Sequence, residues 1–286
     1  MKTKSNFVKF FSFLGFKKIA WSFRRLHCPV SKTDLVLEVG SGGSPYFRSN
    51  ILCDPYFETQ ERHYEKLVTD RITIDAFAEN LPFKDNSFDF LIASHVLEHS
   101  DNPEKFISEI QRVSNAGYIE VPDAFMERLT NYKFHKLEIT QREKTLLIRK
   151  KKNYIHDKEI TELFKHKVEK YFSTFISENP EIFHVCHYWS KNTGGLKYKI
   201  LNPTQKLNWE SPVTNKINYN KRNSKKAFFN KIILSLFRFF LSQHYRNKKI
   251  KIKNLLQCRN CNNTEFKEDK KSFICLECNE RINFFN

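Results

Sequence analysis

The sequence has few glycines, no long apolar run and two long segments without an acidic residue. Only 7 of the 286 residues are glycine. No apolar stretch approaches the roughly 20 residues that a transmembrane helix needs. The short apolar run at 10–16 is followed at once by Lys17 and Lys18 and lacks a small-residue cleavage site. We therefore expect a cytoplasmic protein with neither a membrane span nor a cleaved secretory signal.

Positive charge is concentrated in the two segments that lack acids. The formal net charge is +17. Residues 1–33 contain eight Lys and Arg, residues 211–264 contain thirteen, and neither segment contains Asp or Glu. Blocks of this kind favour an anionic partner, which is a membrane surface, a nucleic acid or a polyanionic substrate.

The length suits one medium domain with a small appendage. We divide the chain into a basic amphipathic segment at 1–30, an α/β domain at 31–205, a linker with a basic amphipathic helix at 206–254 and a cysteine module at 255–286. The two amphipathic helices, predicted at 5–27 and 228–241, mix aromatic side chains with lysines. Each either lies on an anionic membrane, as a peripheral contact, or packs against the α/β domain.

Strand and helix signals alternate through residues 34–125, as they do in a parallel α/β sheet. Apolar runs predict strands at 35–39, 51–53, 72–74, 88–93 and 118–122, and a helix at 103–113. Residues 126–202 are less periodic. They predict a strand at 145–149, a helix at 159–176, and late strands of the same sheet at 184–189 and 196–201.

Three of the seven glycines gather directly after the first predicted strand, in Gly40-Ser41-Gly42-Gly43. Glycines at this place bring bare backbone N–H groups close to a ligand. The pattern lacks the last glycine of the dinucleotide-binding GxGxxG motif, so a nicotinamide cofactor is disfavoured.

Three segments resemble class I S-adenosylmethionine-dependent methyltransferases, in particular the family called methyltransferase type 11. They occur in the order that this family has and at about its spacing. Residues 38–43 (EVGSGG) resemble motif I. Residues 81–90 (LPFKDNSFDF) resemble the segment that leads into the fourth strand, and residues 94–99 (SHVLEH) resemble the segment that follows it. The resemblance covers residues 30–125. It implies a Rossmann-like sheet, mostly parallel with an antiparallel last strand, and S-adenosylmethionine as the cofactor.

The resemblance also implies roles for individual residues. Glu38 would contact the methionine end of the cofactor, and Asp54 would accept hydrogen bonds from the ribose hydroxyls. The loop residues Gly40, Ser41 and Gly42 would bring the backbone to the methionyl and ribose portions. The backbone N–H of Ala78 would meet the adenine.

The adenine end departs from the family pattern. The family usually has Asp immediately before this alanine, and here Phe77 stands there. Either Asp75 reaches the adenine amine or Phe77 stacks on the ring, and we favour Asp75. For Asp75, Asp54 and Glu38, the alternative is that the carboxylate caps its loop or is solvated.

Methyl transfer to a hydroxyl requires a proton acceptor, and histidine is suited to this near neutral pH. His95 follows the fourth predicted strand, at the edge where α/β sheets bind ligands. It is the first candidate base and a candidate cofactor contact. His135, which follows the fifth strand, is the second candidate and would line an acceptor pocket. Structural, hydrogen-bonded histidines are the alternative for both, and we assign His99 to packing.

Four of the seven cysteines form two CxxC pairs at the C-terminus, Cys258/Cys261 and Cys275/Cys278. In a reducing compartment this spacing favours a metal over disulfides. Four thiolates complete a tetrahedral zinc site and leave no open position, so we predict a structural Zn²⁺. The module resembles small zinc ribbons found beside methyltransferase domains.

Three functions remain open. The first is methyl transfer to a small-molecule, glycan or glycolipid acceptor, with the membrane surface as a candidate place of action. The second is RNA methylation, which the positive charge suits, although the basic segments contain no recognisable RNA-reading motif. The third is a non-catalytic cofactor-binding or scaffold protein.

Overall fold

The computed structural model describes residues 6–56, 66–154, 159, 162–163, 169–207, 236 and 238–285. They divide into two compact units, each assembled from separate stretches of chain. Unit 1 comprises Met1–Ser31, Ala93–Pro103 and Ala116–Trp209. Unit 2 comprises Lys32–Ile92, Glu104–Asn115 and Glu210–Asn286.

Three buried parallel strands form the centre of unit 2. They are β1 (Val36–Val39), β2 (Ile51–Cys53) and β3 (Thr73–Ile74), and every residue in them is buried. β2 lies between the other two and pairs in parallel with both. Continuous apolar runs are typical of parallel strands that are covered on both faces. The strands predicted at 35–39, 51–53 and 72–74 are confirmed to within one residue.

The next strand and helix also follow the sequence prediction. β4 spans Phe90–Ser94 and α3 spans Pro103–Val113, with its apolar side chains buried and its charged ones outward. The backbone N–H of Phe88 donates to the carbonyl of Val113 at 3.0 Å, which ties the approach to β4 to the end of α3. The 3-10 turn η3 (Leu97–His99) follows β4.

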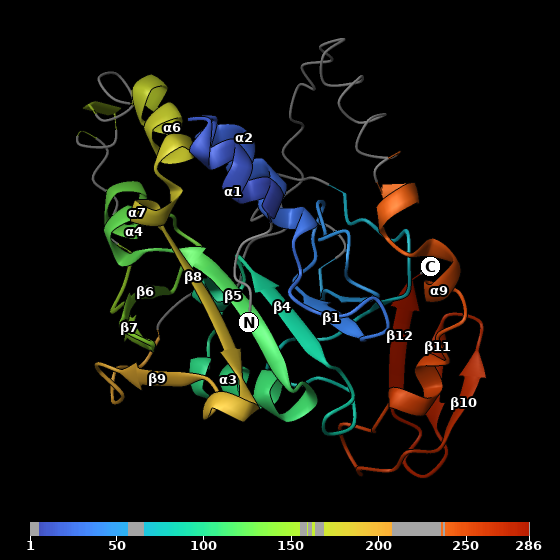
Figure 1. Cartoon of the computed structure of the whole chain (residues 1–286). Coiled ribbons are helices and arrows are strands. Elements are labelled where there is room, and N and C mark those ends of the chain that lie inside the picture. Colours follow the sequence, from blue (N-terminus) through green and yellow to red (C-terminus); the bar gives the residue numbers. More distant parts are fainter. Residues whose placement is uncertain are drawn as a thin grey trace. The chain divides into compact units, whose positions relative to one another are not determined.

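The cysteine module forms a three-stranded antiparallel meander in unit 2, with β10 (Phe266–Asp269), β11 (Ser272–Cys275) and β12 (Arg281–Phe285). β12 also pairs antiparallel with β3, so the module covers what would otherwise be an open sheet edge. The preceding chain contains α9 (His244–Asn247) and η5 (Ile252–Leu255). Figure 1 shows β10–β12 in red.

In unit 1, β5 (Ala116–Pro122) pairs antiparallel with β8 (His184–Ser190) along its whole length. The late strand predicted at 184–189 is therefore confirmed, and it is antiparallel to β5. Burial alternates along β8, with His187 buried and Cys186 exposed, as a strand that has one covered face requires. The mixed α/β fold, with parallel inner strands, an antiparallel late strand and a small cysteine module, confirms the predicted Rossmann-like fold class.

A separate three-stranded sheet in unit 1 contains β6 (Leu137–Arg142), β7 (Thr145–Lys150) and β9 (Lys197–Ile200). The strand predicted at 196–201 exists, but its placement in the main sheet is wrong because β9 pairs with β7. After β8 the chain passes through η4 (Lys191–Thr193) and two glycines with φ of 91° and 73°, and this turn leads it away from β8. Alternation in a sequence identifies an extended segment but not its partner.

The helices of unit 1 are short. They are α1 (Asn6–Phe13), α2 (Lys17–Ser22), η1 (Phe23–Leu26), α4 (Ala124–Thr130), α6 (Glu169–Glu178) and α7 (Pro180–Phe183). The single helix predicted at 5–27 is broken at Gly15, whose φ of 81° ends α1. α2 contacts α6, and α1 and α2 form a hairpin (Figure 1).

Two predicted helices lie partly beyond the described residues. Of the helix predicted at 159–176, the structure describes α6 and a few residues before it. Most of the helix predicted at 228–241 lies outside the described residues. Within the part of the chain that the structure describes, no helix has the length and apolarity to cross a membrane.

Candidate cofactor and acceptor sites

The glycine loop after β1 is fixed by backbone contacts to the end of β2. Gly40 and Gly42 have φ of 62° and 55°, a region that residues with a Cβ rarely adopt. The N–H of Gly40 donates to the carbonyl of Cys53 at 2.7 Å, and the N–H of Gly42 donates to Oδ2 of Asp54 at 3.0 Å. The structure thus brings the glycines and the predicted ribose-binding carboxylate into direct contact.

The polar atoms of this loop suit an incoming ligand. Asp54 is buried, and its Oδ1 accepts a hydrogen bond from the N–H of Tyr56 at 2.9 Å. A carboxylate can accept several hydrogen bonds, so its oxygens suit the hydroxyls of a ribose. Ser41 is 5% exposed, and its hydroxyl has no hydrogen-bond partner among the described residues. A buried hydroxyl without a partner costs free energy that a bound ligand can recover.

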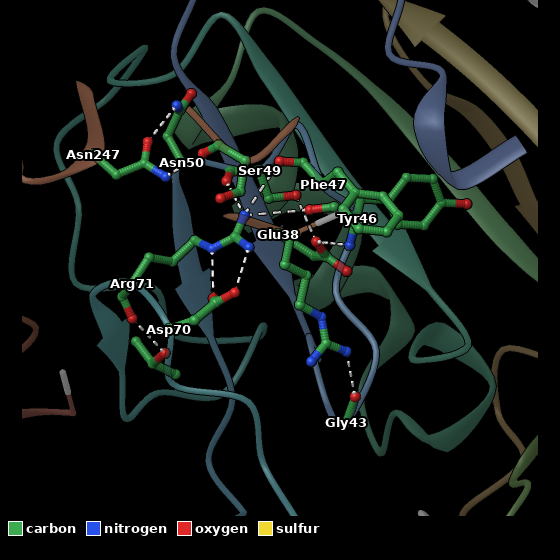
Figure 2. Close-up of polar contacts among 12 residues, drawn as sticks. Glu38, Gly43, Tyr46, Phe47, Ser49, Asn50, Asp70, Arg71 and Asn247 are labelled. Carbon is green, nitrogen blue, oxygen red and sulfur yellow. Dashed lines mark hydrogen bonds and ion pairs between the residues drawn. The ribbon is translucent and has the colours of Figure 1, made fainter. Parts of the chain in front are cut away.

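Glu38 faces the segment that follows the glycine loop. It is 3% exposed, and its Oε2 accepts hydrogen bonds from the N–H of Tyr46 at 2.9 Å and from the hydroxyl of Ser49 at 2.5 Å. Figure 2 shows these contacts, which hold the segment 46–49 to the end of β1. The carboxylate predicted to meet the methionine end therefore also shapes the loop.

Arg71 holds the same segment from the other side (Figure 2). Its side chain is buried, and Nη1 donates to the carbonyls of Ser49 at 2.5 Å and of Tyr46 and Phe47 at 3.4 Å each. Its Nε pairs with Oδ1 of Asp70 at 2.8 Å. Sequence reasoning missed Arg71, because nothing near it in the sequence distinguishes it from a surface arginine.

The residues predicted at the adenine end have different surroundings. Ala78 is buried, whereas Phe77 is 50% exposed and packs edge-to-face with Tyr56 at 5.7 Å between ring centroids. Asp75 is held by β12, because its N–H donates to the carbonyl of Asn283 at 3.0 Å and its Oδ2 accepts from Nδ2 of Asn283 at 3.4 Å. Sequence reasoning missed both Tyr56 and Asn283.

Glu120, on β5 in unit 1, is a fully buried carboxylate surrounded by donors. Nε of Arg24 donates to its Oε2 at 2.8 Å and Nη2 donates to its Oε1 at 2.7 Å. The hydroxyl of Tyr118 donates at 2.6 Å and that of Ser94 at 3.3 Å. These contacts hold its pKa well below the usual value, although burial alone would raise the pKa. Glu120 was not predicted as a site residue.

His95 lies against this carboxylate with an unusual backbone conformation. Its φ is 57°, and its N–H donates to the carbonyl of Glu120 at 2.7 Å. Nε2 lies 3.2 Å from Oε1 of Glu120, and Nδ1 lies 3.4 Å from Oε1 of Glu98. Burial alone would lower the pKa of His95, but the two carboxylates raise it to about 9. A protonated imidazole must lose its proton before it can act as a base.

His135 lies elsewhere in unit 1. It is 6% exposed, and its Nδ1 donates to Oε2 of Glu127 at 2.5 Å. Its ring lies 4.8 Å from that of His99. His135 is not among the residues that line the large cavity of this unit.

That cavity has a volume of about 1050 Å³. Aromatic side chains form much of its wall, among them Trp21, Tyr118, Tyr188 and Trp189. Its charged lining is mixed and contains lysines at 17, 144 and 197 and acids at 123, 178 and 181. The fourth cation of the lining, Arg24, is paired with Glu120. His184 in the same wall contacts the ring of His95 at 5.7 Å between centroids.

The four cysteines of the C-terminal module converge. Their sulfur atoms all lie within 4.8 Å of one another, with Sγ–Sγ distances of 3.4 Å for Cys258 and Cys278 and 3.5 Å for Cys261 and Cys275. Tetrahedral ligation of zinc at about 2.3 Å per bond requires sulfurs roughly 3.8 Å apart. All four are free thiols, so the donor set fits zinc.

Comparison with known proteins agrees with the motifs. Residues 37–119 match the family model of a methyltransferase domain. A 44-residue stretch is 50% identical to an uncharacterised protein of Methanocaldococcus jannaschii, and it covers 15% of this chain and 22% of that protein. The chain thus spans about a fifth of the length of this relative.

Similar solved structures include a chain from the Haloferax volcanii complex of the Trm112 methyltransferase activator with a methyltransferase. It has 16% identity and a TM-score of 0.32, and the match covers 47% of this chain and 73% of that one. A Thermotoga maritima S-adenosylmethionine-dependent methyltransferase has 22% identity and a TM-score of 0.29, with 42% and 57% covered. Because these TM-scores are low, the two structures carry no argument about the function of this chain.

We predict that Arg71→Ala destabilises the protein by about 2–3 kcal/mol, because it removes charged hydrogen bonds to buried carbonyls. Urea denaturation measures the change in the free energy of unfolding. Arg128→Ala is the matched control, since that guanidinium is 64% exposed and pairs with Glu138 at the surface. The control should change stability by less than about 1 kcal/mol. Equal effects of the two variants would contradict the structural role of Arg71.

Proposed function

We propose that the protein binds S-adenosylmethionine through the glycine loop and transfers its methyl group to a small-molecule or glycan acceptor. The observation that carries the cofactor assignment is the direct hydrogen bond between Gly42 and Asp54, in a loop where both glycines have positive φ and the hydroxyl of Ser41 has no partner among the described residues. The family match at 37–119 covers these residues.

The cofactor-binding residues have separate tasks in this proposal. Asp54 accepts hydrogen bonds from the ribose hydroxyls, and the backbone of Gly40, Ser41 and Gly42 meets the methionyl and ribose portions. Glu38 fixes the loop and faces the methionine end. When bound, the cofactor supplies a methyl group activated by its sulfonium. His95, whose ring contacts His184 in the cavity wall, remains the first candidate for handling a proton of the acceptor. His135, the second candidate, does not line this cavity.

For the adenine end, we propose the exposed ring of Phe77, braced edge-to-face by Tyr56, as the stacking surface. Asp75 is the weaker candidate, because its N–H and carboxylate both contact Asn283. The backbone N–H of Ala78 then serves the edge of the adenine, as the family resemblance implies.

We predict that Asp54→Asn weakens the binding of S-adenosylmethionine at least about tenfold, or about 1.4 kcal/mol. The amide carries no charge and offers one acceptor oxygen where the carboxylate offers two. Isothermal titration calorimetry on the full chain measures the change. Asp85→Asn is the control, because that carboxylate is 67% exposed and pairs with Arg112. A folded wild-type protein that binds no cofactor would overturn the assignment.

The cavity in unit 1 supports a small acceptor. Its volume of about 1050 Å³ is of the size that encloses small ligands. Aromatic walls with acids, amides and imidazoles beside them suit the apolar faces and hydroxyls of a sugar. An RNA site needs a surplus of positive charge along a groove, whereas lysines and acids are balanced in this lining. This balance favours the small-molecule acceptor over RNA.

The acceptor class can be tested by incubating the full chain with methyl-labelled cofactor and cell extract. We expect the label in a small-molecule or glycan fraction. Cys186→Trp, which fills the cavity from its exposed β8 position, should raise the KM for this acceptor about tenfold or more. Leu276→Trp is the control, because that side chain is exposed in unit 2.

Other outcomes of this experiment would support the alternatives. Label that ribonuclease releases would favour RNA methylation. Intact cofactor binding without transfer to any fraction would favour the non-catalytic, scaffold alternative.

We further propose peripheral contact between the α1–α2 hairpin and an anionic membrane. One side of α1 packs inward, with Val8 buried and the ring of Phe11 5.4 Å from that of Phe23. The other side exposes aromatic rings, with Phe10 58% and Phe13 88% exposed. Exposed lysines at 9, 17 and 18 accompany these rings. Aromatic side chains beside lysines suit the interface of an anionic bilayer.

We predict that the protein floats with vesicles that contain anionic lipid and remains behind with purely zwitterionic ones. Phe10→Ser combined with Phe13→Ser should weaken partitioning at least about tenfold, because each ring contributes over 1 kcal/mol on burial. Phe125→Ser is the control, since Phe125 is comparably exposed but lies on α4. Flotation that does not depend on the two phenylalanines would contradict this surface.

We also propose that Cys258, Cys261, Cys275 and Cys278 bind a structural zinc ion. The module has a small apolar core, so four metal–thiolate bonds would supply much of its stability.

A further inference from the structure

A second cluster with metal-ligand chemistry lies in unit 1 and consists of Glu98, His99 and His135. One ligand atom from each residue can be chosen so that all three lie within 4.8 Å of one another. Glu98 and His99 are in η3, whereas His135 lies between α4 and β6. Glu98 and His135 are buried and His99 is half-buried. A carboxylate and two imidazoles make a common ligand set for divalent transition metals.

Both imidazoles have a hydrogen bond at Nδ1. Nδ1 of His99 lies 3.2 Å from the carbonyl oxygen of Phe134, which can only accept, so Nδ1 carries the proton. Nδ1 of His135 donates to Oε2 of Glu127. With the proton on Nδ1, the lone pair of each neutral ring lies on Nε2. Ligating histidines typically donate their other N–H to a carbonyl or carboxylate in this way.

Glu98 adds an independent indication. Its side chain is 2% exposed, and neither carboxylate oxygen has a hydrogen-bond partner among the described residues. Its ion pair with His95 leaves 3.4 Å between Oε1 and Nδ1. The protonated His95 is therefore the counter-charge of Glu98 at Oε1, while Oε2 has no hydrogen-bond partner among the described residues. A cation at the cluster would give this buried oxygen a partner.

Glu127 is built to support His135. It is 1% exposed, and its Oε1 is paired with the ammonium group of Lys151 while its Oε2 accepts from His135. The ammonium group holds one oxygen of this carboxylate, and the other oxygen fixes the ring of His135. Such a carboxylate–histidine pair orients a ligand and raises its basicity.

We propose that Glu98, His99 and His135 bind one divalent transition-metal ion of the zinc class, with Glu127 as a positioning residue. Two nitrogen donors disfavour calcium and magnesium, which prefer oxygen ligands. Three protein ligands leave a fourth tetrahedral position for water. The ion ties η3 to the segment before β6, two stretches already joined by the hydrogen bond from the N–H of Lys136 to the carbonyl of Glu98 at 2.7 Å.

The test is metal stoichiometry of the full chain after equilibration with zinc and removal of excess, measured by elemental mass spectrometry. We expect two equivalents in the wild type. His99→Ala combined with His135→Ala should leave one, and Cys258→Ser combined with Cys261→Ser should also leave one, because the two sites are separate. His244→Ala is the control and should retain two. A double histidine variant that retains as much zinc as the wild type, or a double cysteine variant that takes up none, would overturn the proposal.

A second measurement covers the case in which the double histidine variant fails to fold. In the double cysteine variant, cobalt(II) should give visible d–d absorption without thiolate-to-cobalt charge transfer, since its ligands are nitrogen and oxygen. Glu127→Gln should weaken this cobalt binding about 10–100-fold. If cobalt does not bind, or if Glu127→Gln leaves its affinity unchanged, the histidines serve packing only.

Discussion

The carboxylate of Glu120 is fully buried in unit 1, and the surrounding structure depends on its compensation. A buried ion that loses its partner costs about 3–5 kcal/mol. Arg24 meets this need with two hydrogen bonds across 96 residues of sequence. The same guanidinium stacks on Trp21, 3.8 Å from the ring centroid. The charge on β5 thereby fixes η1 and α2, whose side chains contribute to the wall of the cavity.

Unit 2 buries a cation, Arg71, as well as the carboxylates of Glu38 and Asp54. Arg71 points its guanidinium at the carbonyls of the segment 46–49, and Glu38 binds the N–H and hydroxyl groups of the same segment (Figure 2). The irregular segment beside the glycine loop cannot pair its backbone groups in a regular sheet or helix, so charged side chains bind them instead. Glu38 therefore has a structural role whether or not it also touches a cofactor.

Much of the fold and part of the candidate site could be predicted from the sequence, because their causes are local. Buried strands read as apolar runs, and the backbone of the loop requires glycine at positions 40 and 42. Contacts between residues far apart in the sequence leave no comparable pattern in the sequence. Three such contacts arise only when the chain packs. They are the ion pair of Arg24 with Glu120, the hydrogen bonds of Arg71 to backbone carbonyls, and the contact of His135 with His99. The partner of β9 could not be predicted for the same reason. Alternation of apolar and polar residues predicts a strand but does not show which strand it pairs with.

The basic N-terminal segment shows why net charge alone cannot identify a partner. Arg24 is turned inward and neutralised by Glu120, so it contributes nothing to an external anion site. The lysines at 9, 17 and 18 remain exposed, and the rings of Phe10 and Phe13 lie among them. A phosphate backbone would be served by the lysines alone, whereas a bilayer interface also accommodates aromatic rings. The aromatic exposure, more than the charge, therefore favours a lipid surface for this segment.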